Sequence, residues 1–107
     1  MKTKNKIHYR SFDDVAVEHI KKDRELGANY IKFALQEYQK DGDERPLLDA
    51  LKQVAIASGG LADLAVKTGL SRESLYKTLS IKGNPTLKTL NIILKVLGYQ
   101  ISFKAIA

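Results

Sequence analysis

The stretch Leu61–Ser80, LADLAVKTGLSRESLYKTLS, decides the fold of this chain. It predicts two short helices joined by a tight turn, because Gly69 stands where the backbone needs a positive φ and Ser71 follows as a good N-cap. Leu75 and Leu79 are four residues apart on one face of the second helix, so both are expected to point inward. This is the layout of a helix-turn-helix, which lays its second helix in the major groove of DNA.

The second of these helices is expected to present a basic, polar outer face. Two amphipathic helices around a glycine also occur in helical proteins that bind no DNA, so the motif needs support from the rest of the chain. The side chains left to point outward are those of Arg72, Glu73, Tyr76 and Lys77.

The positive charge of the chain is concentrated around this motif. The 107 residues include 18 lysines and arginines against 12 aspartates and glutamates, a formal net charge of +6. Residues 1–59 hold 11 of the basic and 10 of the acidic residues (net +1), whereas residues 60–107 hold the other 7 basic residues and only Asp63 and Glu73 (net +5). Such asymmetry is expected of a surface that binds phosphates, although a merely soluble basic surface is the alternative interpretation.

Apolar-periodic helices are predicted on both sides of the motif. Leu47–Ala57 has Pro46 at its start, where the missing N–H costs nothing. Leu87–Leu97 is a second amphipathic helix, and Gly98 is expected to end it. Its inward stripe is predicted to comprise Leu87, Leu90, Ile93, Leu94 and Leu97.

The loop at residues 81–85 lies between the motif and the last predicted helix. Lys82, Gly83 and Asn84 place a lysine and backbone N–H groups beside the recognition helix, which suits contact with a DNA phosphate. Simple chain reversal is the alternative role of this Gly-Asn-Pro sequence. Either Asn84 or Thr86 can cap the helix that follows.

The N-terminal third predicts two further helices, Phe12–Lys22 and Gly27–Gln39, followed by a polar turn at Lys40–Arg45. Tyr30 and Phe33 lie to the side of the second helix. They either complete the core or form a docking face for a protein partner, since aromatic anchors concentrate binding energy at interfaces. The core stripe of this helix is predicted to comprise Ile31, Ala34, Leu35 and Tyr38.

The C-terminal segment Tyr99–Ala107, YQISFKAIA, alternates apolar and polar residues and predicts a strand. A lone strand is not stable, so it needs a partner. The candidates are the same strand of a second subunit, Lys6–Arg10 of its own chain, and a strand of another protein. We favour the self-pair, because a two-fold dimer would place two recognition helices about one DNA turn (~34 Å) apart on a palindromic operator.

The segment from Phe12 to Gly98 resembles the addiction-module antidote (antitoxin) family, whose helix-turn-helix is of the Cro/repressor (Xre) type. The resemblance implies a lambda-repressor-like fold and an antitoxin that neutralises a co-encoded toxin of the RelE/ParE-like group and represses its own operon. By position it puts the recognition-helix contacts on Ser71, Arg72, Glu73, Tyr76 and Lys77. The matching words are FDDV (12–15), GLSRESLYKTLS (69–80), GNP followed by TLKTL (83–90) and VLG (96–98).

Two places depart from the family pattern. Residues 56–60 (IASGG) replace a stretch that is often more basic and bulkier, and Thr78 stands where alanine is common. These departures bear on the packing of the first motif helix.

The expected fold class is therefore all-α, a bundle of five to six helices with a short C-terminal β-strand. We expect one domain over residues 1–107, which has three parts. Residues 12–44 form a helical extension that can contact a toxin, residues 46–98 form the helix-turn-helix core, and residues 99–106 form the strand that can mediate dimerisation. The predicted DNA-binding residues are Ser71, Arg72, Glu73, Tyr76, Lys77, Lys82 and Asn84.

Composition argues against several other classes of protein. The chain has no cysteine, so neither a disulfide framework nor a thiolate metal site is possible. His8 and His19 lack partners at a recognised metal-ligand or catalytic spacing, and no phosphate-cradling glycine motif is present. We therefore expect no enzyme activity, cofactor or metal. With no apolar run near 18 residues and no signal sequence, a cytoplasmic protein is expected.

Two other functions remain open at this point. The chain could be a stand-alone transcriptional regulator of phage type without a toxin partner, or a protein-interaction module that keeps the helix-turn-helix as a scaffold.

Overall fold

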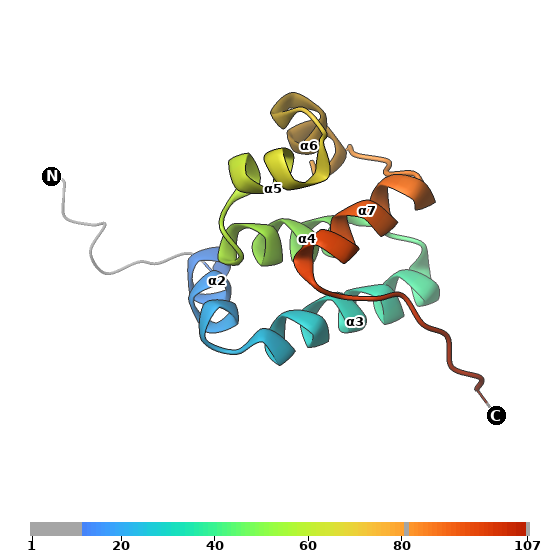
Figure 1. Cartoon of the computed structure of the whole chain (residues 1–107). Coiled ribbons are helices and arrows are strands. Elements are labelled where there is room, and N and C mark those ends of the chain that lie inside the picture. Colours follow the sequence, from blue (N-terminus) through green and yellow to red (C-terminus); the bar gives the residue numbers. More distant parts are fainter. Residues whose placement is uncertain (1–11, 81, 107) are drawn as a thin grey trace, which may run out of the picture.

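The computed structural model describes residues 12–80 and 82–106, and this part of the chain contains six helices and no strand (Figure 1). The all-α class and the predicted number of helices are thus confirmed for the described residues. The helices are α2 (Phe12–Lys22), α3 (Arg24–Asp41), α4 (Arg45–Ala57), α5 (Leu61–Thr68), α6 (Arg72–Thr78) and α7 (Leu87–Leu97).

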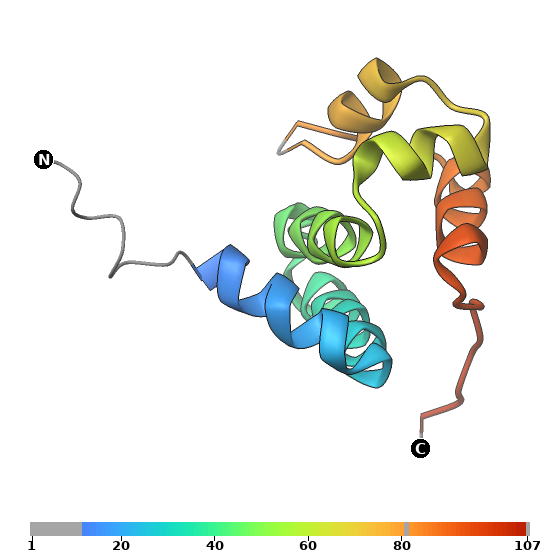
Figure 2. The same cartoon turned by 60° about the vertical axis from the view of Figure 1, so that its left-hand side comes forward.

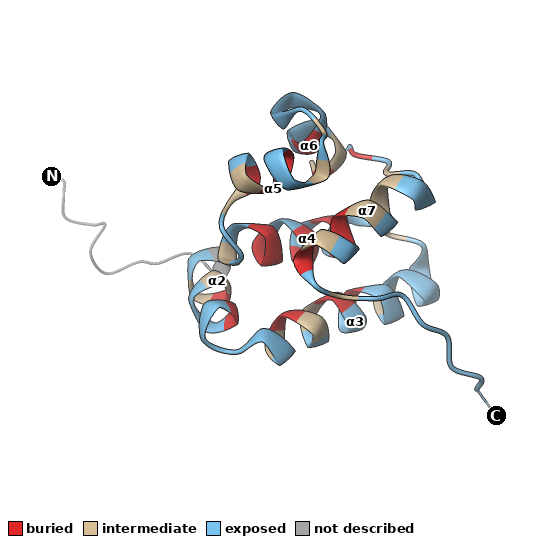
Figure 3. Cartoon of the chain, viewed as in Figure 1, coloured by how far each residue is buried: buried red, intermediate tan, exposed pale blue. Residues whose placement is uncertain are grey.

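Helix α4 occupies the centre of the molecule. It packs against α2 and α3 on one side and against α5 on the other, and α5 in turn contacts α6 and α7 (Figures 1 and 2). One buried apolar cluster takes side chains from all six described helices, as the inward-facing red segments of Figure 3 show. The buried residues of α4 are Leu47, Leu48, Ala50, Leu51, Gln53, Val54 and Ala55.

The two N-terminal helices are separated at Asp23, whose side chain accepts a hydrogen bond from the Glu25 amide (3.0 Å) and caps α3. Helix α3 therefore begins three residues before the predicted start at Gly27. Gly27 lies inside this helix, and a glycine is needed there because neighbouring atoms leave no room for a side chain. A Cβ atom there would stand 2.6 Å from the Tyr99 hydroxyl and 3.1 Å from Cγ2 of Ile20.

The polar turn before α4 is held by a local ion pair. Asp43 accepts hydrogen bonds from the Arg45 backbone amide (3.1 Å) and from the Arg45 guanidinium (2.7 and 2.9 Å). The Arg45 side chain thereby lowers the pKa of the Asp43 carboxyl to about 2. Pro46 follows in the first turn of α4, as predicted.

The predicted core stripes are correct for most positions and wrong for three. Leu35 and Tyr38 of α3 are each 41% exposed, and Leu87 of α7 is 73% exposed. Tyr30 packs against the core, which is the first of the two roles left open for it by the sequence. Periodicity identifies the apolar face of a helix. How much of that face other helices cover depends on the tertiary packing.

The predicted C-terminal strand is wrong for this structure. Tyr99 packs partly on the core, but residues 99–106 adopt no regular secondary structure. The physical reason is that a strand needs a partner for its backbone groups, and within residues 12–80 and 82–106 none is provided. The other intramolecular candidate, Lys6–Arg10, lies outside the described residues.

The packing of α4 predicts a large cost for shortening its central side chain. Leu51 has no exposed surface, so Leu51→Ala should lower the free energy of unfolding by about 2–5 kcal/mol through lost burial and a residual cavity. Urea denaturation followed by circular dichroism measures this. The neighbouring exposed Lys52→Ala is the matched control and should stay within about 0.5 kcal/mol of the parent. Equal effects of the two substitutions would contradict the central position of α4.

Candidate nucleic-acid interface

The turn between α5 and α6 is built from its own hydrogen bonds. Gly69 adopts φ = 78° and donates its amide to the Ala65 carbonyl (3.0 Å), as predicted for the end of a helix. The Thr68 hydroxyl donates to the Leu64 carbonyl (2.8 Å) and accepts from the Leu70 amide (3.2 Å). These contacts fix the direction in which α6 leaves the turn.

Helix α6 is oriented by one cap and two leucines. The Ser71 hydroxyl oxygen accepts a hydrogen bond from the Ser74 amide (3.0 Å), which confirms Ser71 as the N-cap. Leu75 and Leu79 are 0% and 2% exposed. Because both sit in the core, the opposite side of this helix must face solvent.

The outer face of α6 is open and polar. It forms a shallow hollow in the surface, and Tyr76 is 51% exposed there. Five of the lining residues were predicted from the sequence. Ser74 was missed, although it lies three residues before Lys77 and so on the same side of the helix. The lining residues, all of them exposed, are Ser71, Arg72, Glu73, Ser74, Tyr76 and Lys77.

The charge near α6 is mainly positive. Asp63, one of the two acidic residues after position 59, pairs with Lys67 (Oδ2–Nζ 2.9 Å) on α5. Neither Arg72 nor Glu73 takes part in an ion pair with another described residue. Glu73 therefore does not hold the Arg72 guanidinium, which is free to reach a partner outside the chain.

The loop after α6 lies against the end of that helix. The Gly83 amide donates to the Ser80 carbonyl (2.8 Å), and a Cβ atom on Gly83 would collide with the Thr78 carbonyl. This amide is therefore not free to bind a phosphate, contrary to the expectation for the loop backbone. The side chains of Lys82 and Asn84 are exposed beside α6.

The cap of α7 is Thr86 and not Asn84. The Thr86 hydroxyl oxygen accepts from the Thr89 amide (3.1 Å), and Gly98 ends the helix with φ = 93°, as predicted. Asn84 is therefore not needed as a cap.

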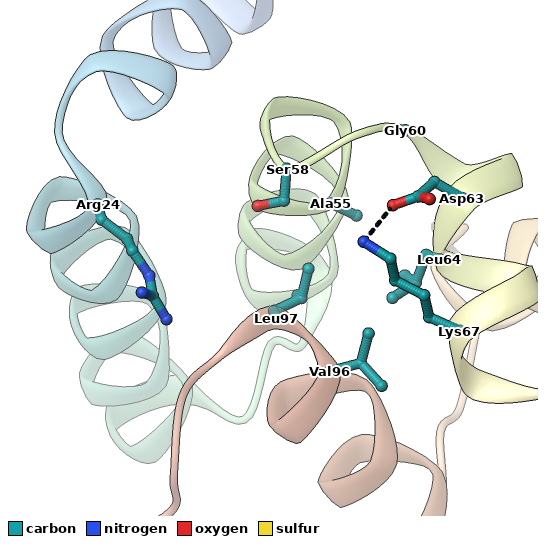
Figure 4. Close-up of a pocket in the computed structure, with 9 residues that line it drawn as sticks. All are labelled: Arg24, Ala55, Ser58, Gly60, Asp63, Leu64, Lys67, Val96 and Leu97. Atoms are coloured by element: carbon teal, nitrogen blue, oxygen red, sulfur yellow. Dashed lines mark ion pairs between the residues drawn. The ribbon is translucent and has the colours of Figure 1, made fainter.

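A separate pocket of about 230 Å³ lies between α4, α5, α7 and the start of α3 (Figure 4). Its charged side chains already have partners. Lys67 pairs with Asp63, and the Arg24 guanidinium donates to the Gly98 carbonyl (3.0 Å). This pocket therefore has fewer unpaired charged side chains for a ligand than the outer face of α6 has.

Other kinds of site find little support among the described residues. No cluster of three or more histidine, aspartate or glutamate side chains could hold a metal ion there. His19 is an exposed residue of α2, and His8 lies outside the described part. None of the described helices combines the length and apolarity that a membrane crossing requires.

Comparison with known proteins gives two matches. A family described as "Probable addiction module antidote protein" matches residues 9–105. An uncharacterized protein of Haemophilus influenzae (strain ATCC 51907 / DSM 11121 / KW20 / Rd) is 37% identical over 87 residues, which cover 81% of this chain and 82% of that protein. No solved structure matches the chain.

The cap of α6 gives a prediction for stability. Ser71→Ala removes the acceptor of the Ser74 amide and should lower the free energy of unfolding by about 1 kcal/mol. Ser74→Ala on the same helix leaves that hydrogen bond intact and is the matched control, with an expected change within about 0.5 kcal/mol. Thermal and urea unfolding of both variants measure the difference. A Ser71→Ala protein as stable as the parent would show that the cap does not hold α6 in solution.

Proposed function

The chain belongs to the family of probable addiction module antidote proteins, and from that premise we propose that it is the antitoxin of a type II toxin–antitoxin module. In this proposal it binds a co-encoded toxin of the RelE/ParE-like group and also represses its own operon by binding operator DNA. Proteins of the antidote family are generally not enzymes, so the proposed activity is binding.

The observation that carries the DNA-binding part is the two-sided character of α6. Leu75 and Leu79 fix one side in the core, while the opposite side exposes charged and aromatic groups. A helix held in this way can enter the major groove, where Arg72 can pair with guanine and Glu73 with cytosine. The preceding helix, α5, then crosses the DNA backbone, and the pair acts as a lambda-repressor-like helix-turn-helix.

The basic and polar side chains around α6 supply phosphate contacts in this proposal. Lys77 lies on the outer face of the helix, and Lys82 and Asn84 flank it on the following loop. Such contacts fix the register of the protein on DNA, whereas base contacts give the sequence preference. Two copies related by a two-fold axis would read the two halves of a palindromic operator.

The toxin-binding part is assigned to residues 12–44, which form one layer of the molecule away from α6 (Figure 1). The structure separates Tyr30 from Phe33 on α3. Tyr30 packs against the core, whereas Phe33 is 64% exposed. Phe33 is therefore the aromatic anchor we propose for a toxin.

The neighbouring gene distinguishes this function from that of a stand-alone regulator of phage type. A short basic reading frame that overlaps or abuts this one favours the antitoxin, and co-expression of the two followed by a pull-down and a growth-rescue assay tests it directly. Absence of such a frame would favour the regulator. Both functions require operator binding through α6.

We expect α6 to be the DNA-reading element. Arg72→Ala should weaken operator binding by about 1–3 kcal/mol if the arginine contacts a guanine. Lys77→Ala should weaken binding to all sequences and reduce the slope of log K against log salt by about one phosphate contact. Fluorescence anisotropy titrations at several salt concentrations measure both effects.

The matched control is Lys52→Ala, which removes an exposed lysine from α4, away from the α6 face. Its operator affinity should be unchanged, and circular dichroism should show the same helix content for all three variants. Unaltered affinity of Arg72→Ala and Lys77→Ala, or binding that does not depend on salt, would refute the assignment of this face to DNA.

We expect Phe33 to matter for the toxin and not for DNA. Phe33→Ala should weaken toxin binding by about 2 kcal/mol or more if the ring is a buried anchor in the complex. Calorimetric titration of the toxin and rescue of growth measure this, and operator binding should stay at the parent level. Val66→Ala, at a residue 82% exposed on α5, is the control for loss of an exposed apolar side chain. If Phe33→Ala keeps full affinity for the toxin, Phe33 is not part of the toxin-binding surface.

A further inference from the structure

We propose that Glu73 makes the binding of operator DNA selective, because its unpaired carboxylate is tolerated opposite cytosine in the major groove and is penalised opposite other bases. The inference rests on the proposed function, since it requires α6 to lie in the groove. It deepens that function by naming the kind of operator that the site takes, one with a cytosine opposite Glu73. It also assigns to Glu73 a second effect, a lowered affinity for DNA of other sequences.

The negative charge of Glu73 is not neutralised within the described part of the chain. Asp63, the other acidic residue after position 59, pairs with Lys67 (Oδ2–Nζ 2.9 Å), whereas Glu73 forms no ion pair with a described residue. Lys77 follows four residues later, at a spacing that favours a Glu–Lys pair on a helix. Lys77 forms no ion pair with a described residue either. The carboxylate is therefore available to a partner outside the chain.

The fold places this carboxylate on the part of α6 that would approach the bases. Ser71 is the N-cap, so Glu73 is the second residue of the helix. Glu73 is exposed and lines the same shallow hollow as Arg72 and Lys77. The N-terminal residues of a recognition helix are those that contact base edges. In the proposed complex Glu73 therefore faces bases and not the solvent at the rim of the interface.

The charges around Glu73 attract DNA of any sequence. Residues 60–107 carry a net charge of +5, and Lys77 and Lys82 are exposed on and beside α6. Contacts between lysines and phosphates carry no sequence information. A protein with such a surface binds one operator selectively only if some element rejects the wrong sequences. Glu73 is the one acidic side chain among those that line the hollow.

The edge of each base determines what a carboxylate meets in the major groove. Cytosine presents its N4 amino group, which donates to the carboxylate. Guanine presents N7 and O6 and thymine presents O4, and all three are acceptors that repel it. Adenine presents its N6 amino group beside the N7 acceptor. A carboxylate that loses its water without gaining a donor weakens binding, so cytosine is the base that Glu73 tolerates best.

A purely structural role for Glu73 gives a different expectation. An acidic side chain in the first turn of a helix interacts favourably with the helix dipole. If this were its only role, Glu73→Gln would destabilise α6 and weaken binding to every DNA sequence equally. The base preference would then stay the same. A measurement of base preference therefore separates the two roles.

The first test is a selection of binding sites from random-sequence duplex DNA by the full chain. The parent should enrich cytosine at one position, and Glu73→Gln should enrich adenine there, because a glutamine side chain pairs with N6 and N7 of adenine. Asp63→Asn is the matched control, since it removes the same charge from within an ion pair on α5. It should keep the base preference of the parent.

The second test compares two duplexes that differ only at this position. Replacing the cytosine by thymine should weaken binding by the parent about 5-fold to 150-fold, and binding by Glu73→Gln much less. Affinity for random-sequence duplex should rise more in Glu73→Gln than in Asp63→Asn, because only the first removes a carboxylate from the hollow on α6. Fluorescence anisotropy at fixed salt measures both effects, and circular dichroism should show equal helix content for all three proteins.

The opposite results overturn the inference. If Glu73→Gln keeps the cytosine preference and the low affinity of the parent for random DNA, Glu73 does not set the selectivity, although the DNA-binding function stands. A uniform loss of affinity with an unchanged preference would assign Glu73 to the stability of α6. A parent that binds no DNA, or binds it without base preference, would remove operator recognition and this inference together. The two kinds of failure are therefore distinguishable.

Discussion

The apolar surface of α4 is buried on two sides, against α2 and α3 on one and against α5 on the other, and the positions of all the other helices depend on this burial. Leu51 and Val54 have no exposed surface, and a fully buried side chain of this kind contributes about 1.5–3 kcal/mol. The central helix therefore joins the N-terminal layer to the helices that carry the candidate nucleic-acid interface.

Helix α6 depends on the shared core for its stability. It has only seven residues, and a helix of that length is unstable alone in water. Its stability comes from Leu75 and Leu79 in the shared core and from the Ser71 cap. Because α6 packs against the core through its inner side alone, the exposed side chains of Arg72 and Lys77 on the outer side are not needed for the fold. The same separation keeps Phe33 on the opposite layer available for a different partner.

Much of this could be predicted from the sequence, because the signals are local. The glycine at position 69, the serine cap at 71 and the leucine spacing 75–79 located the turn and the faces of α6 correctly. Helix α2 has the predicted bounds, whereas α3 begins earlier than expected because an internal Gly27 imitates a helix boundary. The outward residues of α6 were found by the same periodicity, which also indicates Ser74 when the spacing is followed to Lys77.

The sequence by itself determined the helical class, the turn, the caps and the side of each helix that is apolar, since these depend on neighbours within about four residues. The tertiary structure decided how much of each apolar face is covered, as Leu35, Tyr38 and Leu87 show. It also decided the contact between Arg24 and Tyr99, 75 residues apart. Among the described residues it gives the alternating segment after Tyr99 no neighbouring strand. Alternation along one segment records which side chains share a face, but a strand forms only where another backbone lies alongside to complete its hydrogen bonds.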